Sequence, residues 1–228
     1  MFSIIPIDHS YTPRWRFAQY LERRWWQRYL ARRDPAAYLR DKRAYWHRTL
    51  AELNLRPPPA GTRVLDAGCG PAGIFTILPE QAVTALDPLL PAYARDLPHF
   101  DPADYPYVHF VTGTLEDPPP LGDPFPLIYC FNAVNHVADW DAALDGLTAL
   151  AAPGGRLVIS SDVHRHALLY RIFRALPGDL LHPQQHRQKD YHAALERRGW
   201  VLERERVLRE ERIFEYWAGV WRRSRHVL

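Results

Sequence analysis

The stretch TRVLDAGCGPAG, residues Thr62–Gly73, joins an apolar run to three glycines within six residues. Glycine adopts positive φ angles easily and lets another molecule approach the backbone closely. Open α/β sheets bind ligands at the carboxyl ends of their strands, so a glycine-rich turn directly after a buried strand is typical of a binding loop. The stretch therefore predicts a strand that ends in a binding turn.

The segments around this stretch alternate between strand-like and helix-like patterns. Strands are predicted at 62–68, 82–87, 107–113, 127–132 and 156–162, and helices at 72–79, 139–152 and 188–199. Residues 201–208 and 212–222 alternate apolar and polar side chains, which predicts an antiparallel hairpin at the sheet edge. The expected fold is α/β, with a Rossmann-like seven-stranded, mostly parallel sheet, an antiparallel C-terminal hairpin and an N-terminal helical cap.

The predicted cap comprises residues 1–56, and residues 57–228 form the predicted ligand-binding domain. Two helical segments are expected in the cap, with Asp34 as N-cap and Pro35 in the first turn of the second. In the first segment one arc carries the apolar side chains Phe17, Ala18, Leu21, Trp25 and Tyr29. The cap has twelve Lys/Arg against five Asp/Glu, whereas residues 57–196 have eight against sixteen. This division indicates a basic element packed on an acidic body.

Two ligand classes compete for the glycine-rich turn. Gly68, Gly70 and Gly73 satisfy the G-x-G-x-x-G pattern of dinucleotide sites, and Asp87, about 20 residues on, suits ribose hydroxyls. Asp66, however, would repel a pyrophosphate and suits a cationic ligand. S-adenosylmethionine has a ribose, an ammonium and a sulfonium but no phosphate, so these residues favour it over NAD(P). Two plainer interpretations stay open: the glycines as a tight connection, and Asp66 as a carboxylate that caps the loop.

At this point the chain resembles a family. VLDAGCGPAG (64–73) is similar to the first motif of the class I S-adenosylmethionine-dependent methyltransferases, and ALDP (85–88) to their second acidic position. The likeness continues through VTGTLEDPP (111–119) and through 127–160, and so covers roughly residues 62–161. The resemblance implies transfer of a methyl group from S-adenosylmethionine to a small-molecule acceptor, with S-adenosylhomocysteine as product.

The resemblance also implies a set of cofactor-binding residues. Gly68 and Gly70 would let the methionine part lie on the backbone, and Asp87 would bind the ribose. The full set is Asp66, Gly68, Gly70, Asp87, Pro88, Thr114, Leu115, Cys130 and Phe131. Thr114 departs from the family pattern, which often has Asp or Asn there, so a backbone group or Glu116 is the alternative partner of the adenine amino group.

The chemistry implied by this family is an in-line displacement that needs no metal, and needs a base only where the acceptor loses a proton. Three histidines are candidate catalytic bases: His136 after the fourth predicted strand, and His182 and His186 after the fifth. A purely structural role is the alternative for each of them. A metal site is the remaining alternative for His164, His166, His182, His186 and His192, but no matching Cys or carboxylate pattern accompanies them, so no metal is expected.

Three roles are open for the basic cap. A lid over the substrate is favoured. Peripheral membrane contact through residues 13–56 and a nucleic-acid surface are the alternatives, and the acidic middle of the chain disfavours nucleic acid.

The apolar stretches are too short to cross a bilayer, residues 1–10 lack a secretory pattern, and Cys69 and Cys130 are interpreted as free thiols. Together these features predict a cytoplasmic protein. An NAD(P)-dependent oxidoreductase and a non-catalytic binding module remain the rival functions, and O-, N- and C-acceptors all stay open.

Overall fold

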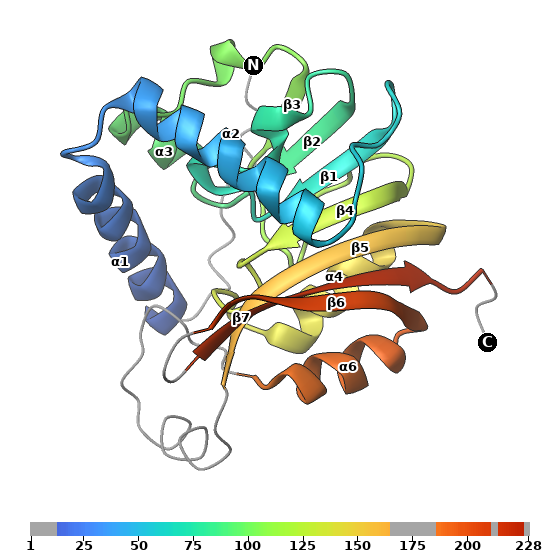
Figure 1. Cartoon of the computed structure of the whole chain (residues 1–228). Helices are drawn as coiled ribbons and strands as arrows, with labels where there is room; N and C mark the ends of the chain where they lie inside the picture. Colours follow the sequence, from blue (N-terminus) through green and yellow to red (C-terminus); the bar gives the residue numbers. More distant parts are fainter. Residues whose placement is uncertain (1–12, 165–185, 211–213, 226–228) are drawn as a thin grey trace.

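The computed structural model describes residues 13–164, 186–210 and 214–225, which form a seven-stranded sheet with helices on both faces (Figure 1). The strand order is β3-β2-β1-β4-β5-β7-β6. The strands are β1 (Arg63–Ala67), β2 (Ala82–Leu86), β3 (Val108–Val111), β4 (Phe125–Phe131), β5 (Ala151–His164), β6 (Trp200–Glu210) and β7 (Phe214–Arg223). β1 to β5 are parallel, and β7 is antiparallel to both β5 and β6. The predicted fold class and the hairpin at the sheet edge are confirmed.

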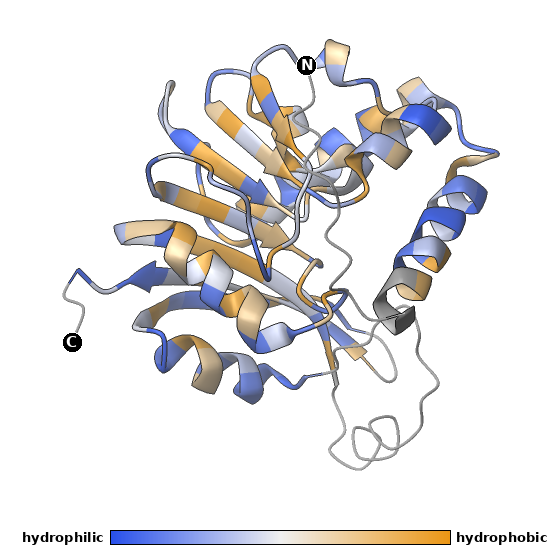
Figure 2. Cartoon of the chain, turned by 180° about the vertical axis from the view of Figure 1, so that it is seen from behind, coloured by the Kyte–Doolittle hydropathy of each residue, from blue (hydrophilic) through white to orange (hydrophobic). Residues whose placement is uncertain are grey.

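Each face of the sheet carries its own hydrophobic core. On one face, Trp46 and Leu50 of α2 (Pro35–Glu52) pack with Val64 of β1. On the other face, α4 (Trp140–Leu150) and α6 (Gln188–Glu196) form a second core with Leu65. Successive side chains of a strand point to opposite faces, so the neighbours in β1 belong to different cores. The parallel strands are accordingly largely orange, and so hydrophobic, in Figure 2.

The start of α2 follows the sequence prediction. Asp34 is the N-cap, its side chain accepts a hydrogen bond from the Ala37 N–H at 2.7 Å, and Pro35 occupies the first turn. Such a cap contributes about 1 kcal/mol to helix stability. α2 therefore has a fixed starting point, which sets the rotation of the side chains that it carries toward the ligand-binding edge of the sheet.

The helix expected at 72–79 is absent from the described structure, and this prediction was wrong. Two short 3-10 helices take its place, η1 (Gly70–Ala72) and η2 (Ile74–Ile77). Gly73 lies between them with extended backbone angles of φ −69° and ψ −175°, and the Asp66 carboxylate accepts the N–H of Phe75. The loop after β1 therefore offers a ligand its backbone and not the N-terminus of an α-helix.

Two other elements differ from the sequence prediction. A helix, α3 (Leu90–Asp96), follows β2 where none was expected, with a third 3-10 helix, η3 (Pro102–Asp104), after it. β5 begins at Ala151 and so includes the Pro-Gly-Gly stretch that was expected to precede it. Residues 90–96 form fewer than two turns, too short for a clear helical period.

The first helix, α1 (Pro13–Leu30), buries only part of the predicted apolar arc, which Trp26 and Leu30 widen. Ala18 and Leu30 are buried, but Phe17, Trp25 and Tyr29 are 48%, 44% and 38% exposed. The packed face of α1 is the one that meets α3, through an ion pair of Arg23 with Asp96 and an edge contact of Trp26 with Tyr93. The rest of the arc is thus left for solvent and for the cavity described below. None of the helices in the described ranges is apolar over a length that could cross a membrane.

Candidate active site

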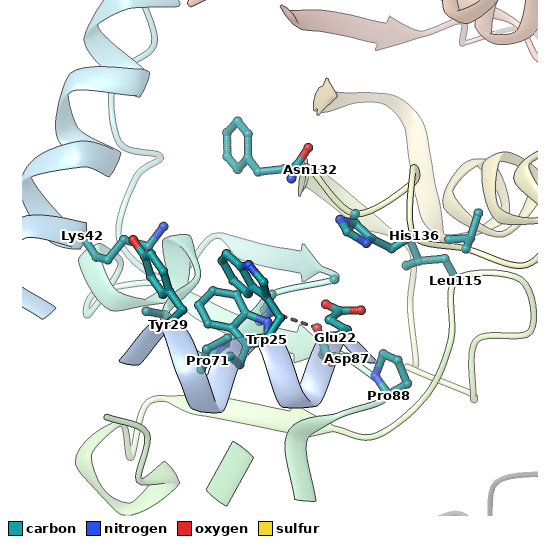
Figure 3. Close-up of a pocket in the computed structure, with 18 of the residues that line it drawn as sticks. Glu22, Trp25, Tyr29, Lys42, Pro71, Asp87, Pro88, Leu115, Asn132 and His136 are labelled. Carbon is teal, nitrogen blue, oxygen red and sulfur yellow. Dashed lines mark hydrogen bonds between the residues drawn. The ribbon is translucent and has the colours of Figure 1, made fainter. Parts of the chain in front are cut away.

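A cavity of about 560 Å³ lies where the carboxyl ends of β1, β2 and β4 meet the two N-terminal helices (Figure 3). Its sheet side includes Gly68, Gly70, Asp87, Pro88, Thr114, Leu115, Phe131, Asn132 and His136. Its helix side includes Glu22, Trp25, Trp26, Tyr29, Tyr38, Lys42, Tyr45 and Trp46. Asp162, Arg209 and Tyr216 extend the wall toward the hairpin. The cavity occupies the edge of the sheet at which the sequence predicted ligand binding.

Two glycines present bare backbone to this cavity. Gly68 and Gly70 have φ angles of +70° and +58°, which side-chain-bearing residues rarely adopt. A Cβ on Gly68 would lie 2.3 Å from the Cβ of Ala133, so the loop after β1 and the loop after β4 touch at this point. The glycine at 68 is therefore required by packing as well as by backbone angle.

Asp87 is placed at the end of β2 with its carboxylate on the cavity wall. One oxygen accepts the N–H of Gly70 at 2.9 Å and the other accepts the N–H of Leu89 at 2.8 Å. Burial, with the nearby Glu22 carboxylate of α1 adding to it, raises the pKa of Asp87 to about 7. Figure 3 shows the Glu22 carboxylate beside that of Asp87. The two carboxylates thus lie together, where they can accept hydrogen bonds from hydroxyl groups or attract a positively charged group.

Asp66, which was predicted to bind the cofactor, is not among the residues that line the cavity. It is 2% exposed and accepts the Phe75 N–H at 3.0 Å, so it has the loop-capping role that the sequence left open. Burial raises its pKa to about 7. A Cβ on Gly73 would lie 2.3 Å from the Asp66 carboxylate, which explains the third glycine of the pattern.

Cys130 was also predicted at the cofactor and also lies elsewhere. Its side chain is fully buried in the core on the α4 and α6 face, whereas Phe131 belongs to the opposite core and lines the cavity. The alternation of β4 separates the two residues. Pro88, Thr114 and Leu115 line the cavity as the prediction required. Glu116 lines it too, with one oxygen accepting the Ala138 N–H at 2.7 Å.

Of the two predicted histidines that the structure describes, only His136 lines the cavity. His136 lines the cavity, whereas His186 stacks on Trp140 with ring centroids 3.8 Å apart and is not among the residues that form the wall. His182 lies outside the described residues, as do His166 and the side chain of His164. His192 pairs with Glu205 at 2.7 Å. Within the described ranges, no three His, Cys, Asp or Glu side chains are grouped in a way that could hold a metal ion.

Several aromatic cavity residues were not predicted as site residues. Trp25 and Tyr29 stack at 4.7 Å between centroids, and Trp46 packs on Phe131 at 5.0 Å and donates to the Ala72 carbonyl at 3.0 Å. Asn132 lies directly after β4 with a φ of 50°, unusual for a residue other than glycine. The helical spacing of the aromatic residues was visible in the sequence, but it could not show which face meets the sheet.

The fold and the cavity together define a class I S-adenosylmethionine-dependent methyltransferase, in which a glycine-rich turn after β1 and an acidic residue after β2 face one cavity. The sequence comparison agrees: residues 17–205 match the methyltransferase domain family, and the chain belongs to this family. The cofactor of this class is S-adenosylmethionine. The residues present fit it, because Gly68 and Gly70 leave room for a chain lying on the backbone and Asp87 offers acceptors for a ribose.

Individual relatives support the same assignment. The chain is 32% identical over 160 residues to a ubiquinone biosynthesis O-methyltransferase of Xylella fastidiosa, covering 65% of this chain and 62% of that protein. It is 30% identical over 151 residues to a trans-aconitate 2-methyltransferase of Delftia acidovorans, covering 63% and 54%. The chain thus spans only about three fifths, or less, of the length of these relatives.

Solved structures share the fold. A putative methyltransferase from Bacillus halodurans superposes with a TM-score of 0.62 at 14% identity, over 77% of this chain and 98% of that one. The magnesium protoporphyrin IX methyltransferase of Synechocystis, solved with bound S-adenosylhomocysteine, has a TM-score of 0.54 at 20% identity, over 83% and 84%. At such identities the likeness establishes the fold alone.

Proposed function

We propose that this chain transfers a methyl group from S-adenosylmethionine to a small-molecule acceptor by direct in-line displacement. The observation that carries the proposal is the single cavity that has Gly68, Gly70 and Asp87 on one side and the aromatic face of α1 and α2 on the other. Its volume of about 560 Å³ suits a nucleoside together with a small second molecule.

The cofactor would be held by residues from three strand ends. Asp87 would accept the ribose hydroxyls, while the backbone at Gly68 and Gly70 would lie against the methionine part. Pro88 and Leu115 would flank the adenine, and Thr114, Glu116 or a backbone group would meet its amino group. When bound, the cofactor supplies a methyl group on a sulfonium, which an acceptor atom can displace directly.

The chain's own part in the reaction is chiefly to position the acceptor and to exclude water. Holding two reactants in line at short range can supply most of the acceleration of such a reaction. Trp25 and Tyr29 of α1 form the side of the cavity that faces the sheet, and Asn132 projects from the end of β4 (Figure 3). His136 is our candidate for the base that removes a proton from the acceptor where the acceptor must lose one.

The two rival functions receive less support. A pyrophosphate of NAD(P) would face the carboxylates of Glu22, Asp87 and Glu116, all of which line the cavity. A non-catalytic binding module would not need a cavity of this volume beside the glycine-rich turn. We also propose a cytoplasmic location, because Cys69 and Cys130 are both free and buried. Peripheral membrane contact through residues 13–56 and the division of the chain after residue 56 stay predictions.

Calorimetry of the full chain tests the proposal. We expect saturable binding of S-adenosylhomocysteine and none of NADH, and we expect an Asp87→Asn variant to bind S-adenosylhomocysteine at least tenfold more weakly, since a charged acceptor of ribose hydroxyls is lost. An Asp41→Asn variant, altered on the exposed side of α2, is the matched control. Binding of NADH without S-adenosylhomocysteine would overturn the assignment.

A further inference from the structure

The side of α1 that faces away from the rest of the molecule carries two aromatic rings and two arginines. Phe17, Tyr20, Arg24 and Arg28 follow one another at intervals of three, four and four residues, which places them on one side of a helix. All four side chains are exposed, Phe17 by 48% and Tyr20 by 53%, and the two rings stack with centroids 6.4 Å apart. We call these four residues the outer face of α1.

The outer face is separate from the contacts that hold α1 in place. Those contacts are made by Arg23 with Asp96 and by Trp26 with Tyr93, on the side of α1 that meets α3. α1 lies at the periphery of the molecule, away from the sheet (Figure 1). A helix that is already packed on one side thus presents the outer face to the surroundings. Large aromatic side chains gathered on a surface in this way are typical of an interaction site.

The charge of this region provides a second, independent observation. Residues 13–33 contain seven arginines and one carboxylate, Glu22, which lines the cavity. Neither Arg24 nor Arg28 forms an ion pair with a carboxylate in the described part of the chain. Arg32, in the turn that follows α1, is exposed as well. A surface with uncompensated positive charge attracts an anionic partner.

An anionic bilayer fits this combination better than two other partners do. A second copy of the chain fits poorly, because a two-fold interface would set the arginines of one copy against those of the other. A nucleic acid fits poorly too, since residues 57–196 carry eight Lys/Arg against sixteen Asp/Glu. Helices that lie in the surface of an anionic bilayer combine aromatic side chains with Lys and Arg, because rings suit the headgroup boundary and cations suit lipid phosphates.

We propose that the outer face of α1 binds the surface of an anionic lipid bilayer, with Phe17 and Tyr20 in the headgroup region and the two arginines against lipid phosphates. A basic residue near such a surface strengthens binding about fivefold. Trp25 and Tyr29, on the adjoining side of α1, line the cavity, so the bound bilayer would lie beside the cavity. The inference concerns a surface outside the cavity and does not rest on the proposed methyl transfer.

Vesicle sedimentation with the full chain tests this surface. The probes are vesicles of phosphatidylcholine alone and vesicles that also contain phosphatidylglycerol, each in about 0.1 M and about 1 M NaCl. We expect the wild type to bind the anionic vesicles at least about tenfold more strongly than the neutral ones. Most of this difference should disappear in the higher salt, because the Debye length falls to about 3 Å and only the contribution of the rings persists.

Two double variants separate the contributions of charge and rings. Arg24→Gln with Arg28→Gln should weaken binding to anionic vesicles about tenfold or more in low salt. Phe17→Gln with Tyr20→Gln should weaken binding in both salt concentrations, because the contact of rings with the headgroup boundary is not screened. All four side chains are exposed, so circular dichroism should show that both variants unfold at nearly the wild-type temperature.

The matched control is Arg40→Gln with Arg48→Gln, which removes the same charge from exposed positions of α2. It should change binding to anionic vesicles by less than about twofold. Equal weakening by the α1 and α2 arginine pairs would mean that net charge alone attracts the chain, and the assignment to α1 would be wrong. The assignment would also be wrong if the wild type sediments with neither kind of vesicle, or if the glutamine variants of α1 sediment as the wild type does.

Two further measurements identify a different partner. Self-association in analytical ultracentrifugation that only the α1 variants abolish would assign the outer face to a second copy of the chain. Tighter binding of a single-stranded oligonucleotide than of anionic vesicles would assign it to a nucleic acid. Either result overturns the proposed bilayer contact. No probe enters the cavity as a methyl donor, so failure of the proposed methyl transfer would leave these results unchanged.

Discussion

The three glycines of the loop after β1 are required for three different physical reasons. Gly68 has a positive φ and touches Ala133, Gly70 has a positive φ and donates its N–H to Asp87, and Gly73 has an ordinary φ but leaves room for the Asp66 carboxylate. A pattern shared with dinucleotide sites therefore arises here from one packing contact, one hydrogen bond to Asp87 and one buried cap. A side chain added at each of the three positions is therefore expected to disturb a different interaction.

Gly68→Ala should both destabilise the chain and abolish binding of S-adenosylhomocysteine. The added Cβ would lie 2.3 Å from the Ala133 Cβ, and the positive φ adds strain, so we expect a loss of about 2–4 kcal/mol in the free energy of unfolding. Gly61→Ala is the matched control, because Gly61 has a φ of +72° with no atom within 4 Å of the added Cβ. It should lose only about 1 kcal/mol by urea denaturation and bind normally. Equal losses in the two variants would mean that the contact with Ala133 does not matter.

Asp66 makes the stability of the chain depend on pH. Its pKa is raised to about 7 by burial, above the value of an unfolded chain, so between about pH 4 and pH 7 the folded state binds the extra proton and stability falls as pH rises. Asp66→Asn removes this contribution while keeping an oxygen acceptor for the Phe75 N–H. Urea denaturation at pH 5 and pH 8 should therefore show a smaller fall for the variant than for the wild type. The exposed Asp41→Asn should retain the full fall, and an unchanged slope in Asp66→Asn would contradict the assignment.

Single residues differ in how far the sequence could predict them. The positions of Asp87 and of the first two glycines were predictable, because residues that directly follow parallel strands lie at the same edge of the sheet. The buried position of Asp66 could not be predicted, because the sequence shows a carboxylate near the loop but not that Phe75 turns its N–H toward it. The position of Cys130 away from the cavity could not be predicted either, because one residue of register in β4 moves a side chain to the other face of the sheet.

At the scale of elements, α1 and α3 act together to place Glu22. α3 directly follows the segment that carries Asp87 and Pro88, and α1 is held on α3 by Arg23 with Asp96 and by Trp26 with Tyr93. Because α3 begins just after the Asp87 loop, the contacts of α1 with α3 also place the Glu22 carboxylate near Asp87. Loosening α1 should consequently disturb the acidic end of the cavity before it disturbs the sheet.

Trp26→Ala should release α1 from α3. We expect faster amide hydrogen exchange across residues 17–30, with little change in β1 and β4, and a loss of about 2 kcal/mol in stability, less than for a fully buried tryptophan. Dissociation of S-adenosylhomocysteine should also become faster in stopped-flow measurements. Tyr20→Ala removes an aromatic side chain that is 53% exposed on the same helix and should leave exchange and dissociation as they are. Equal protection in both variants would show that Trp26 does not anchor α1.

The elements were predictable where their pattern is long or their ends are marked. The strands of the parallel sheet are continuous apolar runs, and Asp34 with Pro35 marks the start of α2. The 3-10 turns after β1 were missed because the sequence does not show that Asp66 contacts the apolar residues of this loop. The buried hydrogen bond to Asp66 outweighs the helical preference of those residues. The packed face of α1 was predicted from hydropathy alone. Hydropathy does not distinguish aromatic side chains that pack in the core from those that line a cavity.

At the scale of the whole molecule, α2 belongs to the sheet as much as to the cap. Trp46 and Leu50 lie in the same core as Val64, and Arg204 of β6 donates to the carbonyl of Asn54 at 2.9 Å. α2 therefore connects the helix side of the cavity to the sheet side. A ligand that fills the cavity contacts both, so its binding should stabilise the chain as one unit.

Thermal unfolding measures this coupling directly. Ligand at about 100 times its Kd adds roughly 2.7 kcal/mol to the stability of the folded state, which corresponds to a rise in Tm of about 5–11 °C for a chain of this size. We expect S-adenosylhomocysteine to produce a rise of this order, with far-UV circular dichroism and tryptophan fluorescence giving the same midpoint, because Trp26 joins α1 to α3 and Trp46 joins α2 to β4. The same concentration of NADH should give no rise. Two separate midpoints, of which only one moves with the ligand, would mean that the helices and the sheet unfold independently and that the cavity between them is not closed by the ligand.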